Sequence, residues 1–187
     1  MRGERARTNS VPRRGPARLI VRAISARATK GFVEIGPYRF RCALGRSGVA
    51  AIKREGDGAS PRGRWRARLA FYDAARVSRP ATGLPIRAVA DDDGWCDAPS
   101  DRNYNRQVWL PYPASAEPLR RDDGLYDYVV VVDYNERPRA RGRGSAIFLH
   151  VARPGFAPTE GCVALRREHL QRVLALLRRG TPIDIYV

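Results

Sequence analysis

The sequence predicts a mostly β protein: one β-sandwich domain with a single α-helix near its C-terminal end and a long irregular loop. The length of 187 residues suits one domain with its own hydrophobic core. Runs such as YVVVVDY and SAIFLH are rich in the β-branched and aromatic residues that strands favour. Clear helical spacing of apolar residues occurs in one segment, close to the C-terminus.

The first residues of the chain are basic. Residues 1–17 are rich in Arg, and the apolar run that follows them is interrupted at Arg22. A signal peptide needs a longer apolar stretch after its basic start, so we expect residues 1–17 to be a disordered basic arm and the domain to span 18–187. No segment approaches the ~20 apolar residues of a membrane-spanning helix, so we expect none.

Strands account for the first half of the domain. Residues 18–24 and 31–43 are predicted strands joined by a short polar turn, and AAIK at 50–53 begins a third. Residues 64–72 alternate with a period of two, which is typical of a half-buried strand. One face of that strand is predicted to carry Trp65, Ala67, Leu69 and Phe71.

The middle of the chain, from Pro80 to Glu117, is predicted to have irregular backbone structure. The acidic run at 91–101 lacks the spacing and the final Glu of a calcium loop, so we expect no metal site and no cofactor. Residues 91–123 are predicted to form a long surface loop anchored by Trp95 and Trp109, of the kind that often lines a site. Candidate wall residues in this loop are Trp95, Asn103, Tyr104, Tyr112 and Arg121.

Strands and one helix complete the predicted domain. Residues 126–135 form the most apolar strand, and SAIFLH at 145–150 forms the last strong one. A helix is predicted within 161–180, with Gly180 where a C-cap belongs, and TPIDIYV at 181–187 closes as a short strand. The apolar stripe of the helix consists of Leu170, Val173, Leu174 and Leu177.

The net charge of +16 comes almost entirely from Arg, and such a surface attracts polyanions. The basic arm and the arginines between 137 and 143 could contact phosphates without reading a base sequence. No recognition helix, RNP-like aromatic strand or zinc-ligand spacing accompanies them. A basic nucleic-acid-binding protein is therefore the alternative from another functional class, and we expect no specific nucleic-acid partner.

A cysteine and a histidine carry the candidate chemistry. His150 ends an apolar strand, and Cys162 follows a Pro/Gly-containing loop, directly after Gly161. A thiol becomes a useful nucleophile when a nearby base favours its thiolate, and glycine permits a tight turn and close substrate approach. Most free cysteines are buried and inert, so this pattern alone leaves a structural role open. The other histidine, His169, falls on the predicted helix.

The remaining cysteines are Cys42 and Cys96. No two of the three cysteines form a CxxC motif, which argues against a metal or redox site of that type. A disulfide between Cys42 and Cys96 is left open.

The segments SAIFLH and PTEGCVAL resemble the catalytic signature of the L,D-transpeptidase (YkuD-like) family, in which a histidine ends a strand and an S-H-G-C-[IV]-R-like loop carries the nucleophile. KREGDGASPRGRW at 53–65 resembles the T-P-x-G-x-F-like sequence of the family's early hairpin, and the resemblance spans 18–187. It implies a β-rich fold, a Cys–His mechanism and peptidoglycan stem peptides as partners. By position, Cys162 is the nucleophile, His150 the base and Gly161 the flexible residue before the thiol.

The sequence departs from the family pattern near the nucleophile. Thr159 and Glu160 replace the usual serine and histidine, and Ala164 replaces an arginine, which indicates a divergent branch. Arg153 or Arg166 could supply the missing charge to a substrate carboxylate, and Glu160 could contact a substrate amine. The candidate substrate-binding residues are Arg153, Thr159, Glu160, Tyr134 and Asn135.

The resemblance implies that a thioester forms at an L-to-D junction of a stem peptide and is passed to an amine acceptor, which makes a cross-link. An L,D-carboxypeptidase or endopeptidase with the same Cys–His site is the nearest alternative, and a non-catalytic wall-binding module is a third. Which L-to-D junction is attacked stays open. The resemblance also implies a periplasmic or cell-envelope location, and we expect a monomer.

Overall fold

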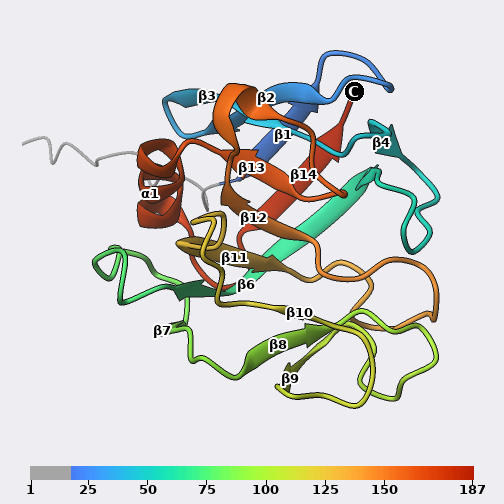
Figure 1. Cartoon of the computed structure of the whole chain (residues 1–187). Coiled ribbons are helices and arrows are strands. Elements are labelled where there is room, and N and C mark those ends of the chain that lie inside the picture. Colours follow the sequence, from blue (N-terminus) through green and yellow to red (C-terminus); the bar gives the residue numbers. More distant parts are fainter. Residues whose placement is uncertain (1–17) are drawn as a thin grey trace, which may run out of the picture.

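Two β-sheets and a separate two-stranded pair organise residues 18–187, the part of the chain that this computed structural model describes (Figure 1). The basic arm expected at 1–17 lies outside the described residues. The predicted mostly β fold with one helix towards the C-terminus is confirmed. In chain order the elements are β1 Leu19–Ala23, β2 Lys30–Ile35, β3 Tyr38–Ala43, β4 Val49–Ala50, β5 Ser60–Pro61, β6 Gly63–Tyr72, β7 Ile86–Ala88, β8 Asp93–Cys96, β9 Arg106–Trp109, β10 Ala116–Pro118, β11 Tyr128–Val132, β12 Phe148–Val151, the 3₁₀-helix η1 Pro154–Phe156, β13 Val163–Leu165, α1 Arg167–Leu176 and β14 Pro182–Tyr186.

The larger sheet, called the main sheet, has the strand order β11-β12-β13-β3-β2-β1-β14-β6-β7. Because β11 pairs with β6 as well as with β12, this sheet closes on itself. Most neighbours are antiparallel, but three pairs run parallel: β12 with β13, β1 with β14, and β6 with β7. The pair of β12 and β13 places the two segments of the predicted catalytic signature side by side.

The apolar side of α1 packs into the main core, the larger cluster of buried apolar side chains. Leu170, Val173 and Leu174 are buried among residues of the main sheet, as their spacing predicts. The helix ends at Leu176, and Leu177 has an extended backbone although its side chain is still buried. Gly180 is therefore not the C-cap; it lies in the following turn, where its N–H donates to the carbonyl of Ala67.

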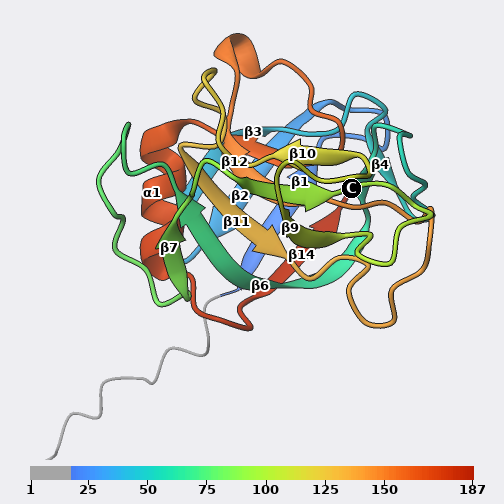
Figure 2. The same ribbon diagram turned by 60° about the horizontal axis from the view of Figure 1, so that its bottom comes forward.

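The segment predicted as a long irregular loop instead contains a three-stranded sheet, called the small sheet, in the order β10-β8-β9 (Figure 2). Trp95 of β8 is buried and anchors the small sheet as expected, but Trp109 is 72% exposed and anchors nothing. The strands are short and contain Asp, Gly and Arg, so they lack the alternation by which a sequence reveals a strand. Their pairing depends on residues distant in the chain.

A second core fills the space between the small sheet and one face of β11 and β12. Trp95 packs edge-on against Phe148 of β12, with 5.2 Å between ring centroids. Val129 and Val131 face this second core, whereas Val130 and Val132 face the main core. Both faces of β11 are therefore buried, which explains its continuous apolar sequence.

A β-bulge in β6 corrects the predicted strand face. Val131 lies opposite Leu69 and Val132 lies opposite Ala67, so Arg68 is an extra residue on that strand. An extra residue reverses the alternation of side chains between the two faces. Ala67 consequently faces the main core while Leu69 and Phe71 face the second core, and the prediction of one shared face is wrong.

Three other predicted elements differ in extent. The segment predicted as one strand at 31–43 forms two, β2 and β3, because the chain turns at Gly36, whose φ is +56°. The strand expected from 50–53 is limited to Val49–Ala50, and Lys53 lies beyond it. The short strand β13 follows Cys162 where only a helix was predicted.

The three cysteines are all buried free thiols, so Cys42 and Cys96 form no disulfide. Cys42 belongs to the main core, whereas Cys96 lies on β8 of the small sheet. None of the helices within residues 18–187 combines the length and the apolar character that crossing a membrane requires.

Candidate active site

Parallel pairing of β12 with β13 places Cys162 and His150 on one face of the main sheet. Leu149 pairs with Val163, so Phe148 lies beside Cys162. Phe148 and Cys162 both belong to the second core. His150 is two residues beyond Phe148 on the same strand and therefore shares its face. The ring of Tyr126 contacts both Phe148 and His150 edge-on, with centroids 5.9 and 5.4 Å apart.

The thiol of Cys162 is held by two backbone groups near the start of β12. Its Sγ accepts the N–H of Phe148 at 3.3 Å and donates to the carbonyl of Ala146 at 3.2 Å. Burial raises the pKa of this thiol to about 12, and the negative charge of Glu117 adds to the rise. The Phe148 N–H and the charge of Lys53 act in the opposite direction. The resting sulfur is therefore a protonated thiol.

His150 is held in one tautomer. Its Nδ1 lies 2.9 Å from the carbonyl oxygen of Val151, which can only accept a hydrogen bond. Nδ1 must therefore carry the proton, and Nε2 presents its lone pair. Burial, helped by the nearby positive charges of Arg153 and Arg121, lowers the pKa of His150 to about 4. The resting imidazole is neutral and ready to accept a proton at Nε2.

Both residues line one pocket of about 470 Å³, called the central pocket. It lies where the second core opens to solvent, between the main sheet and the small sheet. Three of the predicted substrate-binding residues, Arg153, Thr159 and Glu160, line it as well. The other lining residues are Lys53, Glu55, Gly56, Asp97, Glu117, Arg121, Leu125, Tyr126, Ser145 and Ala146.

The turn before Cys162 requires glycine. Gly161 has φ of +133°, and a Cβ there would lie 2.7 Å from the carbonyl oxygen of Ala59 and 3.2 Å from Nζ of Lys53. Thr159 braces the same turn, because its Oγ1 donates to the carbonyl of Cys162 at 2.7 Å and accepts the N–H of Gly161 at 3.2 Å. Gly161 and Thr159 thus set the position of the sulfur.

The other predicted substrate-binding residues have different surroundings. Glu160 forms an ion pair with Arg46 at 2.7 Å, and its side chain is 76% exposed at the rim. Arg153 forms no ion pair or side-chain hydrogen bond within residues 18–187. Tyr134 and Asn135 lie outside the central pocket and line a neighbouring hollow.

Hydrogen bonds explain the position of Tyr134 and Asn135. The Tyr134 hydroxyl donates to the carbonyl of Arg143, and the Asn135 amide donates to the carbonyls of Ala140 and Gly144. Both side chains therefore hold the basic turn at 137–144.

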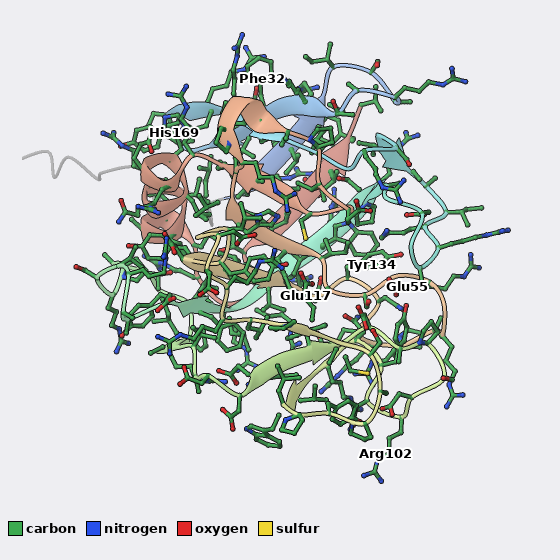
Figure 3. The ribbon with its side chains drawn as sticks, viewed as in Figure 1. Phe32, Glu55, Arg102, Glu117, Tyr134 and His169 are labelled. Carbon is green, nitrogen blue, oxygen red and sulfur yellow. The ribbon has the colours of Figure 1, made fainter. Side chains whose placement is uncertain are left out.

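His169 does not join the central pocket. It belongs to α1 and stacks on Phe40 with ring centroids 4.4 Å apart, and Figure 3 shows it well apart from Glu117. The central pocket also contains groups that sequence reasoning did not select, chiefly Lys53 and Glu117. Lys53 was considered only as the end of a predicted strand and as part of a segment that resembles the family, and Glu117 had no distinguishing signal in the sequence.

Within residues 18–187, no group of three or more His, Cys, Asp or Glu side chains is arranged to hold a metal ion. The arrangement in the central pocket is a thiol, a neutral imidazole with a free nitrogen, and backbone amides at a glycine-containing turn. Such a set can carry out covalent catalysis on a carbonyl group.

Comparison with known proteins identifies a family. The model of the YkuD family, described as an L,D-transpeptidase catalytic domain, matches residues 25–185. A search of curated protein sequences found no match.

Solved structures were also compared. Bd1075 of Bdellovibrio bacteriovorus aligns with a TM-score of 0.48 and 14% identity over 91% of this chain and 48% of that chain. An L,D-transpeptidase from Mycobacterium smegmatis aligns with a TM-score of 0.44 and 15% identity over 91% and 59%. L,D-transpeptidase 1 of Mycobacterium tuberculosis aligns with a TM-score of 0.38 and 16% identity over 90% and 62%. This chain therefore spans less than two thirds of the length of these proteins.

Proposed function

We propose, from the premise that this chain belongs to the YkuD family of L,D-transpeptidase catalytic domains, that it acylates Cys162 with a peptidoglycan stem peptide and transfers the acyl group to an amine. The observation that carries this proposal is the shared pocket of Cys162 and His150, in which Nε2 of His150 is the free ring nitrogen. The product of transfer is a cross-link between two stem peptides.

The first half of the proposed reaction is attack on the carbonyl of an L-residue that precedes a D-residue. Because the thiol and the imidazole are both neutral at rest, the proton moves from Sγ to Nε2 of His150 as Sγ bonds to the carbonyl carbon. The imidazolium then protonates the departing amine. The C–N bond breaks and a thioester on Cys162 remains.

The tetrahedral intermediate requires donors for its oxyanion. We assign this role to backbone amides of the turn around Gly161, where one good donor contributes ~2.7–4 kcal/mol. The Gly161 N–H already donates to Oγ1 of Thr159 at 3.2 Å, so the amide of Cys162 is the one assigned to the oxyanion. The ammonium of Lys53, which is paired with Asp57 at 2.7 Å, lies close to Gly161, and its charge favours the thiolate of Cys162.

Arginines near His150 suit the acidic groups of a stem peptide. Arg153 and Arg121 both line the central pocket, and the charges of both lower the pKa of His150. Arg121 is already paired with Asp123 at 2.6 Å, whereas Arg153 has no ionic partner within residues 18–187. We therefore assign the binding of a substrate carboxylate to Arg153.

Incubation of the purified protein with muropeptides, followed by mass spectrometry, tests the proposal. Cross-linked dimers indicate transfer, whereas shortened monomers alone indicate the L,D-carboxypeptidase or endopeptidase alternative at the same site. Both products should disappear in Cys162→Ala. A reaction that persists in this variant would refute the assignment of the nucleophile.

The substrate also implies where the protein acts. Peptidoglycan lies in the cell envelope, so we propose the periplasm or cell envelope as the site of action, with the protein acting as a monomer. Fractionation of cells and size-exclusion chromatography of the purified protein test these two points.

A further inference from the structure

The small sheet presents two carboxylates to the central pocket. Glu117 of β10 pairs with Trp95 of β8, so both side chains lie on one face of the small sheet. Asp97 is two residues beyond Trp95 and shares that face. Since Trp95 packs on Phe148, this face is turned towards β12, and Figure 3 shows Glu117 between the two sheets.

The hydrogen bonds of Glu117 leave one of its oxygens free. Oε1 accepts the hydroxyl of Tyr126 at 2.7 Å and lies 3.5 Å from a guanidinium nitrogen of Arg121. Oε2 has no donor within residues 18–187. The neighbouring Asp97 has a buried Oδ1 that also lacks a hydrogen-bond partner in this part of the chain. The two carboxylates thus retain acceptor capacity inside the pocket.

The negative charge of Glu117 is unfavourable for acylation, the first half of the proposed reaction. Among the charged groups that shift the pKa of the Cys162 thiol, Glu117 has the largest effect, and its negative charge disfavours the thiolate. Glu117 and Cys162 line the same pocket, so the carboxylate borders the space that an incoming nucleophile must enter. A cation bound at Oε2 would cancel this unfavourable charge. The arrangement therefore suits a cationic group that enters the pocket.

The other carboxylates that line the pocket suit this role less well. Glu160 also acts on Cys162, but its side chain is 76% exposed and is paired with Arg46. Glu55 accepts the hydroxyls of Tyr104 and Ser145 on a single oxygen, which ties the surrounding loops together. Glu117 alone combines partial burial, a free oxygen and an effect on the nucleophile.

We propose that Glu117 binds the ammonium group of the acceptor and takes its proton, so that the neutral amine attacks the Cys162 thioester. This inference rests on the proposed transferase function and deepens it by naming the residue that receives a cationic primary amine. An ammonium ion has no lone pair, so a proton must leave before a C–N bond can form. Oε2 of Glu117 is the acceptor for that proton.

Two protons leave the acceptor nitrogen in this step. The ammonium gives one proton to Glu117, the amine nitrogen bonds to the thioester carbonyl carbon, and the tetrahedral intermediate gives a second proton to Nε2 of His150. The C–S bond breaks, and the departing sulfur regains a proton from His150. Glu117 then releases its proton to solvent.

The experiment compares Glu117→Gln with the wild type and with Glu34→Gln, the same substitution in a partly exposed ion pair with Arg39 outside the central pocket. Gln keeps an oxygen for the Tyr126 hydroxyl, so we expect the variant to fold, as circular dichroism will check. Acylation is followed by the mass of the adduct that a carbapenem forms on Cys162. Transfer is followed as the ratio of aminolysis to hydrolysis of a donor muropeptide at increasing acceptor concentration.

We expect Glu117→Gln to acylate at least as fast as the wild type while its aminolysis-to-hydrolysis ratio falls at least tenfold near pH 7. The ratio should recover at alkaline pH, where the acceptor is already a neutral amine, and a purely structural role would not produce that recovery. Glu34→Gln should match the wild type throughout.

An unchanged ratio in Glu117→Gln, or an equal loss at every pH, would overturn the role of Glu117 and leave the proposed function standing. Loss of acylation with an unchanged ratio would assign Glu117 to the donor peptide and would also overturn it. If the wild type itself forms no adduct and no cross-link, the proposed function fails, and this inference falls with it. If Glu117→Gln does not fold, Glu117→Asp replaces it in the test. This variant keeps the negative charge on a side chain that is one methylene shorter, and it must lower the aminolysis-to-hydrolysis ratio.

Discussion

Nδ1 of His150 lies 2.9 Å from the carbonyl oxygen of Val151, the next residue on the same strand. This contact determines the tautomer of the ring, because a carbonyl only accepts hydrogen bonds. The nitrogen that remains, Nε2, is therefore the one with a lone pair, and His150 lines the same pocket as Cys162. The backbone of β12 thus fixes the tautomer that the proposed role of His150 as a base requires.

Replacement of His150 by Ala should lower the rate of acylation by ~10²–10⁴-fold, the usual contribution of a general base. The thiol, whose pKa is raised to about 12 by burial, cannot ionise unaided near neutral pH. Mass spectrometry of carbapenem adducts with time measures this rate. His169→Ala is the matched control, since His169 stacks on Phe40 outside the central pocket, and it should acylate normally. Equal rates in His150→Ala and the wild type would contradict the assigned base.

The rate of acylation should remain high down to an unusually low pH. Burial lowers the pKa of His150 to about 4, so the imidazole remains a neutral base down to about that pH. We expect kcat/KM for acylation to fall as the pH drops through about 4, not near the ordinary value for histidine. The amount of carbapenem adduct on Cys162, measured at fixed reaction times and constant ionic strength across this pH range, tests the prediction. An acid limb centred at pH 6–7 would show that His150 is better solvated than its burial indicates.

The same burial links stability to pH. The pKa of His150 is lower in the folded than in the unfolded state, so the unfolded state binds more protons between those two values. The free energy of unfolding should therefore fall by up to ~3 kcal/mol as the pH is lowered from above the ordinary histidine pKa to about 4. Urea unfolding across this range measures the change. In His150→Gln this part of the pH dependence should be absent, and an identical slope in both proteins would contradict the prediction.

Gly161→Ala should lose both stability and acylation. The added Cβ would lie 2.7 Å from the backbone carbonyl of Ala59, which cannot move as a side chain tip can, and φ is +133°. We expect a loss of ~1–3 kcal/mol in the free energy of unfolding and a displaced sulfur. Gly142→Ala is the control, because Gly142 also has a positive φ, +70°, but nothing lies within 4 Å of an added Cβ. Comparable losses in the two variants would show that the close approach at Gly161 is unimportant.

Asp127 should contribute more to stability than an exposed carboxylate does. Its side chain is 1% exposed and forms ion pairs with Arg76, at 2.7 Å, and with Arg167 of α1. Since both arginines remain partly solvated, we expect Asp127→Asn to cost ~1–3 kcal/mol. Asp91→Asn, at an 86% exposed partner of Arg120, should cost at most ~1 kcal/mol. Chemical unfolding of both variants at pH 7 checks the difference, which would vanish if burial of Asp127 had no effect.

Much of the fold follows from local patterns that the sequence displays. The period of two located β6, the continuous apolar run located β11, and the spacing of Leu170, Val173 and Leu174 located α1. In the candidate site, Cys162 and His150 could be selected because glycine before a cysteine and histidine at a strand end are visible within a few residues. These features depend on neighbours in the chain, so the sequence by itself determined them.

Other features depended on pairing between distant segments. The small sheet, the bulge at Arg68 and the placement of Glu117 opposite Trp95 arise only when strands separated in sequence meet. No local sequence pattern predicts these features. Short strands with Asp, Gly and Pro lack alternation, and one extra residue in a strand moves the following side chains to the opposite face. The sequence by itself suggested Cys162 and His150 as the candidate catalytic pair, and tertiary structure decided which charges surround them, since electrostatic effects depend on distance in space and on burial.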